Sequence, residues 1–381
     1  MRSRALLGLL LLGCGARATP AESRHLAADP HAEPAHSAEA GTAASATPAS
    51  ASAFVLKGGS IFGVGKQNLL IDKGHVLAVG VAGNAAQRVV NVGGRYIVPG
   101  FIDCHVHLAY YPVGAELLAG GIVAVLDLAA PLSALSVDHS PLRVLNAGPM
   151  ITAKAGYPTT SWGAGGYGLE VTSPSTGAAA VETLFAAGAQ AIKVPLTAPP
   201  TLDDATVKAV VSAAHAHGLK VYTHALEDAN AARAAADGVD VLAHTPTEAL
   251  SSTTLDAWKT RTVIGSLSAF GGGAAAVKNL HDLRERGSRV LYGTDFGNTR
   301  DTHIQEQEIT LLVSAGMDGE SIVKSGTSAA AAFLGLTDYG SLEVGKRASF
   351  LVLAADPTVD PHTLSQPVAV YVDGELLSAG L

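Results

Sequence analysis

From residue 101 to residue 295 the chain alternates short apolar runs, typical of buried strands, with Ala-rich segments of helical periodicity. The expected strands cover residues 101–108, 121–128, 143–148, 191–196, 220–226, 239–245, 262–267 and 289–295. Helical patterns such as TVKAVVSAAHAHG and AAAVKNLHDLRERG lie between several of them and end in a glycine, which suits a helix C-terminus. This repeated alternation predicts an α/β fold in which eight parallel strands close into a (β/α)8 TIM barrel over residues 98–339.

Short strand patterns with glycine-bearing turns precede and follow this region. The stretches AFVLKGGSIF, NLLIDKGHVLAVG and QRVVNVGGRYIVPG come before it, and SLEVGKRASFLVLAADP and VAVYVDGELL come after it. The simplest architecture joins the two terminal segments, residues 53–97 and 340–381, into one small β-sandwich domain that flanks the barrel.

The N-terminal residues predict export. Two arginines precede an apolar run over residues 5–12, which is too short for a stable bilayer anchor and is typical of a signal peptide, here over residues 1–17. The letters LLGC resemble a bacterial lipobox, which implies cleavage before Cys14 and its lipidation; an ordinary signal peptide cleaved near ATPA is the alternative. Residues 18–52, rich in Ala, Pro and Ser, are expected to form a disordered tether. We therefore expect a periplasmic, outer-membrane or cell-surface lipoprotein of a bacterium, bound to the membrane only through its lipid.

The charge balance argues against several classes of partner. The chain has 25 Lys and Arg against 33 Asp and Glu, a net charge of −8, and no basic run stands out, which argues against a nucleic-acid partner. Its two cysteines, Cys14 and Cys104, exclude a disulfide framework. We expect a small-molecule substrate, and a homo-oligomer is compatible with the sequence.

Polar side chains interrupt the apolar strands near their C-terminal ends, where the active site of such a barrel lies. They are His105 and His107 on the first strand, Lys193 on the fourth, His224 on the fifth, His244 on the sixth and Asp295 on the eighth. His105 and His107 have one residue between them on the predicted strand and therefore face the same side. Burying one such group without a partner costs roughly 1–3 kcal/mol, so several on separate strands need a common solution. A shared metal site provides one.

Taken in order, the motifs PGFIDCHVHL, IKV, VYTHA, LAHT and GTDFG resemble the amidohydrolase superfamily, and the tail GSLEVGKRASFLVLAADP resembles its C-terminal β-segment. The likeness is greatest to the imidazolonepropionase-like and prolidase-like hydrolases. The resemblance implies two divalent metal ions. One would be held by His105, His107 and Asp295, and the other by His224 and His244, with a carbamylated Lys193 bridging both. Zinc is the expected metal, although iron, manganese and cobalt also suit these ligand types.

The resemblance further implies metal-dependent hydrolysis of an amide, cyclic amide or peptide C–N bond. A metal-bridged hydroxide would attack the carbonyl carbon, and Asp295, as general base and acid, would take the proton of the water and return it to the leaving amine. Gly293 and Gly297 would let the backbone and a ligand approach closely beside Asp295. Asp103 has no ligand role in this interpretation and is expected to brace loops near the strand end.

Two candidates for substrate binding lie on predicted loops. Tyr157 belongs to the long, Gly-rich segment 151–168, which also carries Trp162 and Tyr167 and has the length of a lid or binding loop. His303 follows the eighth strand in a loop expected over the barrel mouth. Relatives often have the histidine of a Gly-Gly-His motif where Tyr157 stands, so dipeptidase specificity does not follow from the resemblance.

Two other functions stay open at this point. A mononuclear imidazolonepropionase- or deaminase-type ring hydrolase often lacks the lysine of the fourth strand, so Lys193 counts against it. A non-catalytic surface lipoprotein on the same scaffold would not be expected to keep all of the ligand positions.

Overall fold

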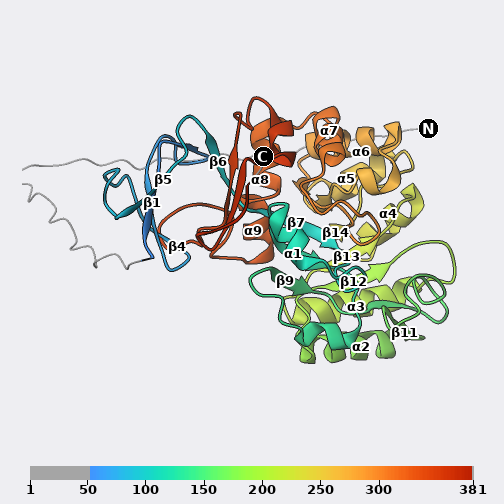
Figure 1. Ribbon diagram of the computed structural model, residues 1–381. Coiled ribbons are helices and arrows are strands. Elements are labelled where there is room, and N and C mark those ends of the chain that lie inside the picture. Colours follow the sequence, from blue (N-terminus) through green and yellow to red (C-terminus); the bar gives the residue numbers. More distant parts are fainter. Residues whose placement is uncertain (1–51, 380–381) are drawn as a thin grey trace, which may run out of the picture. The chain divides into compact units, whose positions relative to one another are not determined.

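The computed structural model describes residues 52–379, which lie within one compact unit (Figure 1). Each of the eight apolar runs expected to be a strand contains one. These strands are β7 (Phe101–Val106), β8 (Ile122–Asp127), β9 (Arg143–Asn146), β12 (Ile192–Pro195), β13 (Val221–His224), β14 (Val241–Leu242), β15 (Thr262–Ile264) and β16 (Arg289–Leu291). Most of their residues are buried, as expected for strands covered on both faces.

The pairing of these strands is parallel but falls into two sheets. One sheet has the order β7-β8-β9 and the other the order β12-β13-β14-β15-β16. Between them in the chain, β10 (Met150–Ala153) pairs with β11 (Gly168–Val171) in a separate parallel sheet. The amide of Cys104 on β7 donates to the carbonyl of Tyr292 after β16, over 3.0 Å, which links the two sheets at one side. The α/β class with parallel sheets is thus confirmed, but strand pairing does not run continuously around all eight strands, and the closed barrel stays a prediction.

Helices follow most of these strands, and their boundaries have local causes. They are α1 (Gly114–Ala119), α2 (Pro174–Ala186), α3 (Asp204–Ala216), α4 (Asp228–Ala236), α5 (Ser252–Trp258), α6 (Ala274–Glu285), α7 (Glu306–Ser314), α8 (Gly319–Ser325) and α9 (Ser328–Leu334). Three short 3-10 helices are η1 (Leu132–Ser136), η2 (Ser268–Phe270) and η3 (Pro361–Ser365). The side chain of Asp203 accepts the amide of Thr206 at the start of α3, and Gly218, with φ +69°, follows its end. The helix predicted from TVKAVVSAAHAHG is therefore present.

Two further sheets contain the terminal segments. The first, of order β4-β3-β1-β5, consists of β1 (Phe54–Lys57), β3 (Leu69–Asp72), β4 (His75–Val79) and β5 (Arg88–Asn91). The second, of order β19-β18-β17-β6-β2, consists of β2 (Ser60–Ile61), β6 (Tyr96–Pro99), β17 (Phe350–Leu353), β18 (Ala369–Val372) and β19 (Glu375–Ala379). Antiparallel pairing of β6 with β17 joins the N-terminal and C-terminal segments. Phe54 and Phe350 belong to one apolar cluster drawn from both sheets, while their arrangement as a sandwich stays a prediction.

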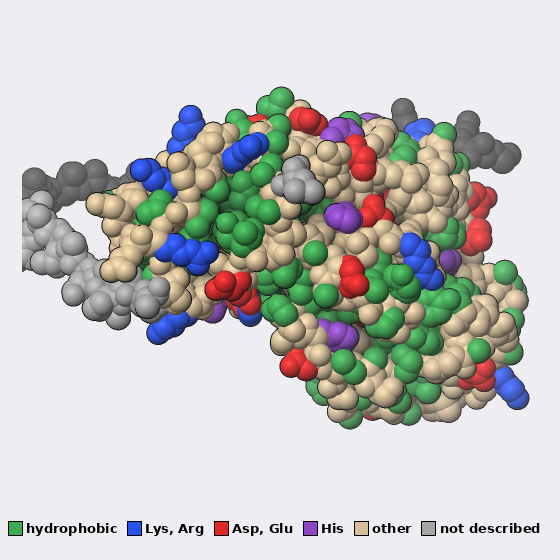
Figure 2. Space-filling view, viewed as in Figure 1, with side chains coloured by type: hydrophobic (Ala, Val, Ile, Leu, Met, Phe, Trp, Pro, Cys, Tyr) green, Lys and Arg blue, Asp and Glu red, His purple; other side chains and the backbone are tan. Residues whose placement is uncertain are grey.

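Among residues 52–379 no helix is long and apolar enough to cross a membrane. The predicted signal peptide with Cys14 lies outside the described residues, and so does the tether predicted over residues 18–52, except for its last residue. Figure 2 shows Lys and Arg as separate side chains rather than as one continuous basic surface on the face that it presents.

Candidate metal centre

His105, His107 and Asp295 meet at one place although almost two hundred residues separate them in the chain. The two histidines lie on and just after β7, with their ring centroids 5.1 Å apart. Oδ1 of Asp295, which follows β16, lies 3.0 Å from Nε2 of His107 and 3.5 Å from Nε2 of His105. One ligand atom from each residue lies within 4.8 Å of the others, which is the spacing expected of groups able to share a metal ion.

The other predicted ligands adjoin this trio. The ring of His244, just after β14, lies 4.4 Å from that of His105, and the ring of His224, at the end of β13, lies 4.8 Å from that of His244. Lys193 on β12 is close enough for its charge to act on His105 and His224. The structure therefore brings together all six residues that the sequence singled out as ligands.

Five of the six side chains are almost inaccessible to water, and several nitrogens of the cluster have no partner. Lys193 and His105 are 0% exposed, His107 and His244 are 2% exposed, Asp295 is 4% exposed, and His224 is partly exposed. Within residues 52–379, the buried nitrogens without a hydrogen-bond partner include Nε2 of His105, Nδ1 of His107, Nζ of Lys193 and Nδ1 of His244. Unpaired buried nitrogens in one cluster are costly without a shared partner, so these residues fit a site for divalent metal ions.

A backbone contact orients one of these rings. Nδ1 of His105 lies 2.7 Å from the carbonyl oxygen of Ala243. Because a carbonyl oxygen can only accept, Nδ1 carries the proton, and the lone pair of Nε2 is left for a metal. This contact also ties the end of β7 to the strand region that carries His244.

Burial sets the protonation states of the cluster. It lowers the pKa of Lys193 to about 7 and that of His224 to about 3, and it lowers the pKa of His105 and His244 well below the usual range. Burial acts to raise the pKa of Asp295, but the contacts of Asp295 with histidines, His105 foremost, outweigh burial and lower this pKa to about 2. Neutral imidazoles beside an ionised carboxylate are the forms in which these groups bind metals.

The glycines of the motif GTDFG allow the unusual backbone conformation around Asp295. Asp295 has φ +55°, and Gly297 has φ +105°. A Cβ at position 297 would lie 2.5 Å from the carbonyl oxygen of His107, so only glycine lets the two segments approach this closely. Nδ2 of Asn298 donates to Oδ1 of Asp295 over 3.1 Å and holds the carboxylate in place.

Asp103 braces the same region, as expected. This buried carboxylate accepts the amides of His105 and Thr294 over 3.0 and 3.2 Å and the hydroxyl of Thr294 over 2.5 Å. It therefore fixes β7, which carries the histidines, against the turn that carries Asp295. Sequence reasoning expected the brace but could not identify Thr294 as its partner.

Of the two substrate-binding candidates, the structure brings one to the cluster. The ring of Tyr157 lies 5.4 Å from that of His224. The sequence had assigned no role to Trp162, whose ring lies 5.0 Å from that of His107, or to Phe270 of η2, whose ring lies 4.9 Å from that of His244. An aromatic residue soon after a strand end was the available signal for Phe270.

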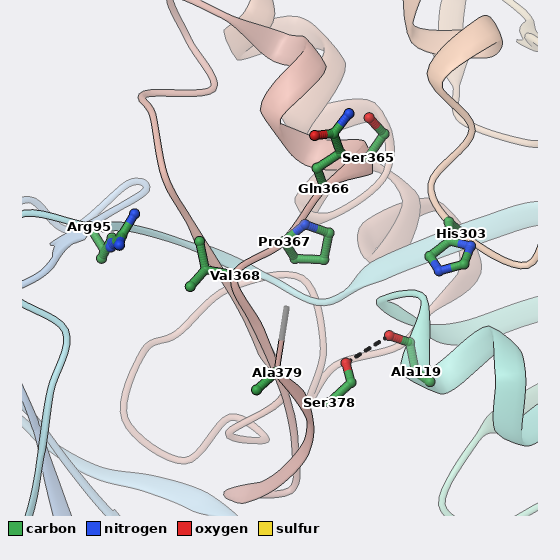
Figure 3. Close-up of a pocket in the computed structure, with 9 residues that line it drawn as sticks. All are labelled: Arg95, Ala119, His303, Ser365, Gln366, Pro367, Val368, Ser378 and Ala379. Carbon is green, nitrogen blue, oxygen red and sulfur yellow. Dashed lines mark hydrogen bonds between the residues drawn. The ribbon is translucent and has the colours of Figure 1, made fainter. Parts of the chain in front are cut away.

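His303 lies elsewhere. It lines a cavity of about 730 Å³ together with Arg95, Ala119, Ser365 and Ser378 among others, and none of the six predicted ligands lines this cavity. Figure 3 shows the side chain of His303 among these residues. Its Nδ1 lies 3.3 Å from a carboxylate oxygen of Asp301. The expected position over the metal centre is therefore not observed for His303.

The amidohydrolase family matches residues 96–377 of this chain, a span that includes every predicted ligand and both parallel sheets. The chain belongs to the amidohydrolase family. The fold of this amidohydrolase is similar to that of a Xaa-Pro dipeptidase with bound methionine, with a TM-score of 0.74 and 20% identity, covering 86% of this chain and all of the other. It is also similar to a putative prolidase from Bifidobacterium longum, with a TM-score of 0.70 and 22% identity, covering 85% of this chain and 94% of the other.

A shorter segment of the chain is similar to a deaminase. Over 42 residues this amidohydrolase is 55% identical to an adenine deaminase from Shewanella halifaxensis (strain HAW-EB4). The match covers 10% of this chain and 7% of the deaminase, so this chain spans only a small part of that protein.

Proposed function

We propose that this amidohydrolase is a hydrolase with two metal ions that cleaves an amide, cyclic amide or peptide C–N bond of a small molecule. The observation that carries the proposal is the convergence of six metal-binding side chains, five of them buried and several with nitrogens that have no other partner. Burying such groups without a common ligand would destabilise the fold, so their retention favours a site that is loaded with metal.

Each side chain has a role in the proposed centre. His105, His107 and Asp295 would hold one ion, and His224 and His244 the other. Lys193, as a carbamate, would bridge them, with zinc as the metal. The amine suits this modification because burial disfavours its ammonium form. In the proposed complete centre the strands form a closed (β/α)8 barrel around these ligands.

The chemistry divides between the metal and the chain. Bound divalent ions would acidify a water molecule and polarise the carbonyl group of the substrate. Asp295, held by the amide of Asn298, would accept a proton from that water and return it to the leaving nitrogen. The contact of His105 with the carbonyl of Ala243 would keep the histidine ring in its ligating orientation.

A second candidate is a mononuclear ring hydrolase of the deaminase type. The short match to adenine deaminase favours it. Lys193 argues against it, because a buried amine without a hydrogen-bond partner, whose charge acts on His105 and His224, has a ready role between two ions.

Metal analysis and a hydrolysis screen test these candidates together. The purified protein would be assayed with dipeptides, N-acyl amino acids, lactams and lactones, beside Lys193→Ala and beside the exposed control Lys66→Ala. About two metal ions per chain with activity lost only in Lys193→Ala supports the proposal. One ion per chain favours the mononuclear candidate, and no bound metal favours a non-catalytic scaffold. Undiminished activity in Lys193→Ala overturns the role of Lys193.

We also propose that the protein is exported and anchored by lipid at Cys14. Labelling cells with an alkyne-bearing fatty acid should mark the wild-type protein and leave Cys14→Ser unlabelled. Label retained in the variant would reject lipidation at this residue.

A further inference from the structure

Three aromatic rings pack directly against the histidines of the metal centre. Trp162 lies against His107, Tyr157 against His224, and Phe270 against His244, with ring centroids 5.0, 5.4 and 4.9 Å apart. All three rings are partly exposed, and so is His224, whereas His107 and His244 are buried. The rings therefore cover the ligands and border the space in which a substrate would lie.

Two of these rings are held as a pair, and further aromatic side chains extend the cover. Nε1 of Trp162 donates to the hydroxyl oxygen of Tyr157 over 2.8 Å. The ring of Trp162 also lies 5.1 Å from that of Tyr110 and 5.4 Å from that of Tyr167. The wall beside the metal centre is thus built from flat apolar surfaces with phenol groups at their edges.

Within residues 52–379, no Lys or Arg side chain lies over the ring of Tyr157, Trp162 or Phe270. The guanidinium of Arg300 lies over Tyr110 and Tyr111, 5.6 and 4.2 Å from their ring centroids. The ring of Tyr110 in turn adjoins that of Trp162, so Arg300 is linked to the wall through Tyr110.

This composition favours one class of substrate. A carboxylate next to the scissile bond would be desolvated against aromatic rings without a cation in contact, which is unfavourable. A planar apolar group would instead stack on the rings. We propose that Tyr157 and Trp162 determine the specificity of the hydrolase, and that they select amides that have no carboxylate and carry a planar, apolar group beside the scissile bond over free dipeptides. The inference rests on the proposed hydrolase activity and names its substrate class.

Matched substrates test the two halves of the proposal. Glycyl-phenylalaninamide and glycyl-phenylalanine differ in the terminal charge, and glycyl-alaninamide lacks the ring; release of glycine would be measured for each with the metal-loaded enzyme. We expect kcat/KM for glycyl-phenylalaninamide to exceed that for each of the others at least about tenfold. Equal values for the phenylalanine substrates with and without the terminal carboxylate would overturn the proposal.

Variants assign the selectivity to the rings. Trp162→Ala should lower kcat/KM for glycyl-phenylalaninamide, mainly through KM, about tenfold more than it lowers kcat/KM for glycyl-alaninamide. Tyr157→Phe, which keeps the ring but loses the hydrogen bond, should have a smaller effect of the same kind. Phe185→Ala is the control, because it also removes an aromatic ring that packs on a histidine. Phe185 is 43% exposed and stacks on His217, which follows the end of α3. Equal losses for both substrates in Trp162→Ala would show a merely structural role and reject the assignment.

Binding can be followed without turnover. The chain has two tryptophans, and Trp258 is 1% exposed with its Nε1 donating to the carbonyl of Ala231. Phenylacetamide should therefore change the fluorescence of the wild type and not that of Trp162→Phe, and acetamide and phenylacetate should bind at least about tenfold more weakly. Tighter binding of phenylacetate that is lost in Arg300→Gln would overturn the proposal in favour of a carboxylate site. If phenylacetamide binds as expected but no amide is hydrolysed, the proposed function fails and the specificity of the wall stands.

Discussion

Glu308 on α7 offers a stability test that does not depend on catalysis. Its side chain is 0% exposed, Oε2 accepts the amide of Ser268 over 2.8 Å, and Oε1 has no hydrogen-bond partner. Ser268 begins η2, the turn that carries Phe270 to the metal centre. Burial raises the pKa of Glu308 from 4.5 to about 7, against the lowering effect of the hydrogen bond from Ser268. Above neutral pH the folded protein therefore holds a poorly solvated carboxylate.

The magnitude follows from linkage. An acid whose pKa is raised by folding binds its proton more tightly in the folded state, so its stabilising contribution is fully present below pH 4.5 and is lost as pH rises through about 7. At about 1.4 kcal/mol per pH unit, the loss over this window is at most about 3 kcal/mol. Glu308→Gln stays neutral and keeps an oxygen for Ser268. We therefore expect the variant to be more stable than wild type by up to about 3 kcal/mol at pH 8 and equal to it near pH 4.5.

Urea unfolding of both chains between pH 4.5 and 8, at one fixed metal concentration, measures this difference. Asp103, whose pKa burial raises to about 7, gives a slope of the same sign in both chains. The charge of Glu308 adds to the raised pKa of Asp103, so the difference between the chains contains this smaller contribution, which has the same sign. The exposed Glu375→Gln should change stability by less than about 0.5 kcal/mol at every pH. A Glu308→Gln variant that is equally destabilised at all pH values would refute the reasoning, because it would mean that the ionised carboxylate is needed.

Three further predictions concern the metal centre. Gly297→Ala should lose at least about 2 kcal/mol of stability and most bound metal, because its Cβ would lie 2.5 Å from the carbonyl oxygen of His107. The control Gly188→Ala is also at positive φ but in open space, so it should lose only about 1–2 kcal/mol and keep its metal. Urea unfolding and metal analysis measure both effects. Lys193→Met should stabilise the metal-free protein by about 1–3 kcal/mol in urea, since a buried unpaired amine is removed, yet lower the hydrolysis rate of the loaded enzyme about 100-fold. Chelation should lower the thermal midpoint of the wild type and abolish hydrolysis, and added zinc should restore both; hydrolysis that persists in chelator would contradict the proposed mechanism.

Much of the site could be predicted because strand periodicity is local. His105 and His107 face the same side because they are one residue apart on a strand, and the observed ring separation of 5.1 Å agrees. The strand ends that carry Lys193, His224 and Asp295 meet because parallel strands present their C-terminal ends at one edge. These relations need only the order of strands and helices.

The parts that could not be predicted depend on contacts between distant loops. Thr294, the partner of Asp103, is 191 residues away in the sequence, and no pattern links the two. The conformation of the loop that contains His303 could not be predicted from the sequence either. The carbonyl of Thr302 and Cα of His303 lie within 2.1 and 2.8 Å of the position that a Cβ on Gly120 would occupy. This segment packs on a glycine next to Ala119, and His303 consequently lines the cavity beside Ala119.

The division of the proposed ligands between the sheet of β7 and the sheet of β12 would give a bound metal a structural role as well. His105 and His107 come from the sheet of β7, while Lys193, His224 and His244 come from β12, β13 and the end of β14 in the other sheet. Backbone pairing does not continue from β9 to β12, so ligand–metal bonds would tie the sheets together across the cluster itself. Removing the metal leaves buried nitrogens unpaired on both sheets at once. The strand ends should therefore be the first part of the parallel sheets to open in the metal-free protein, and amide exchange at β7 and β13 should rise on chelation more than exchange at β17, which lies in the terminal sheet.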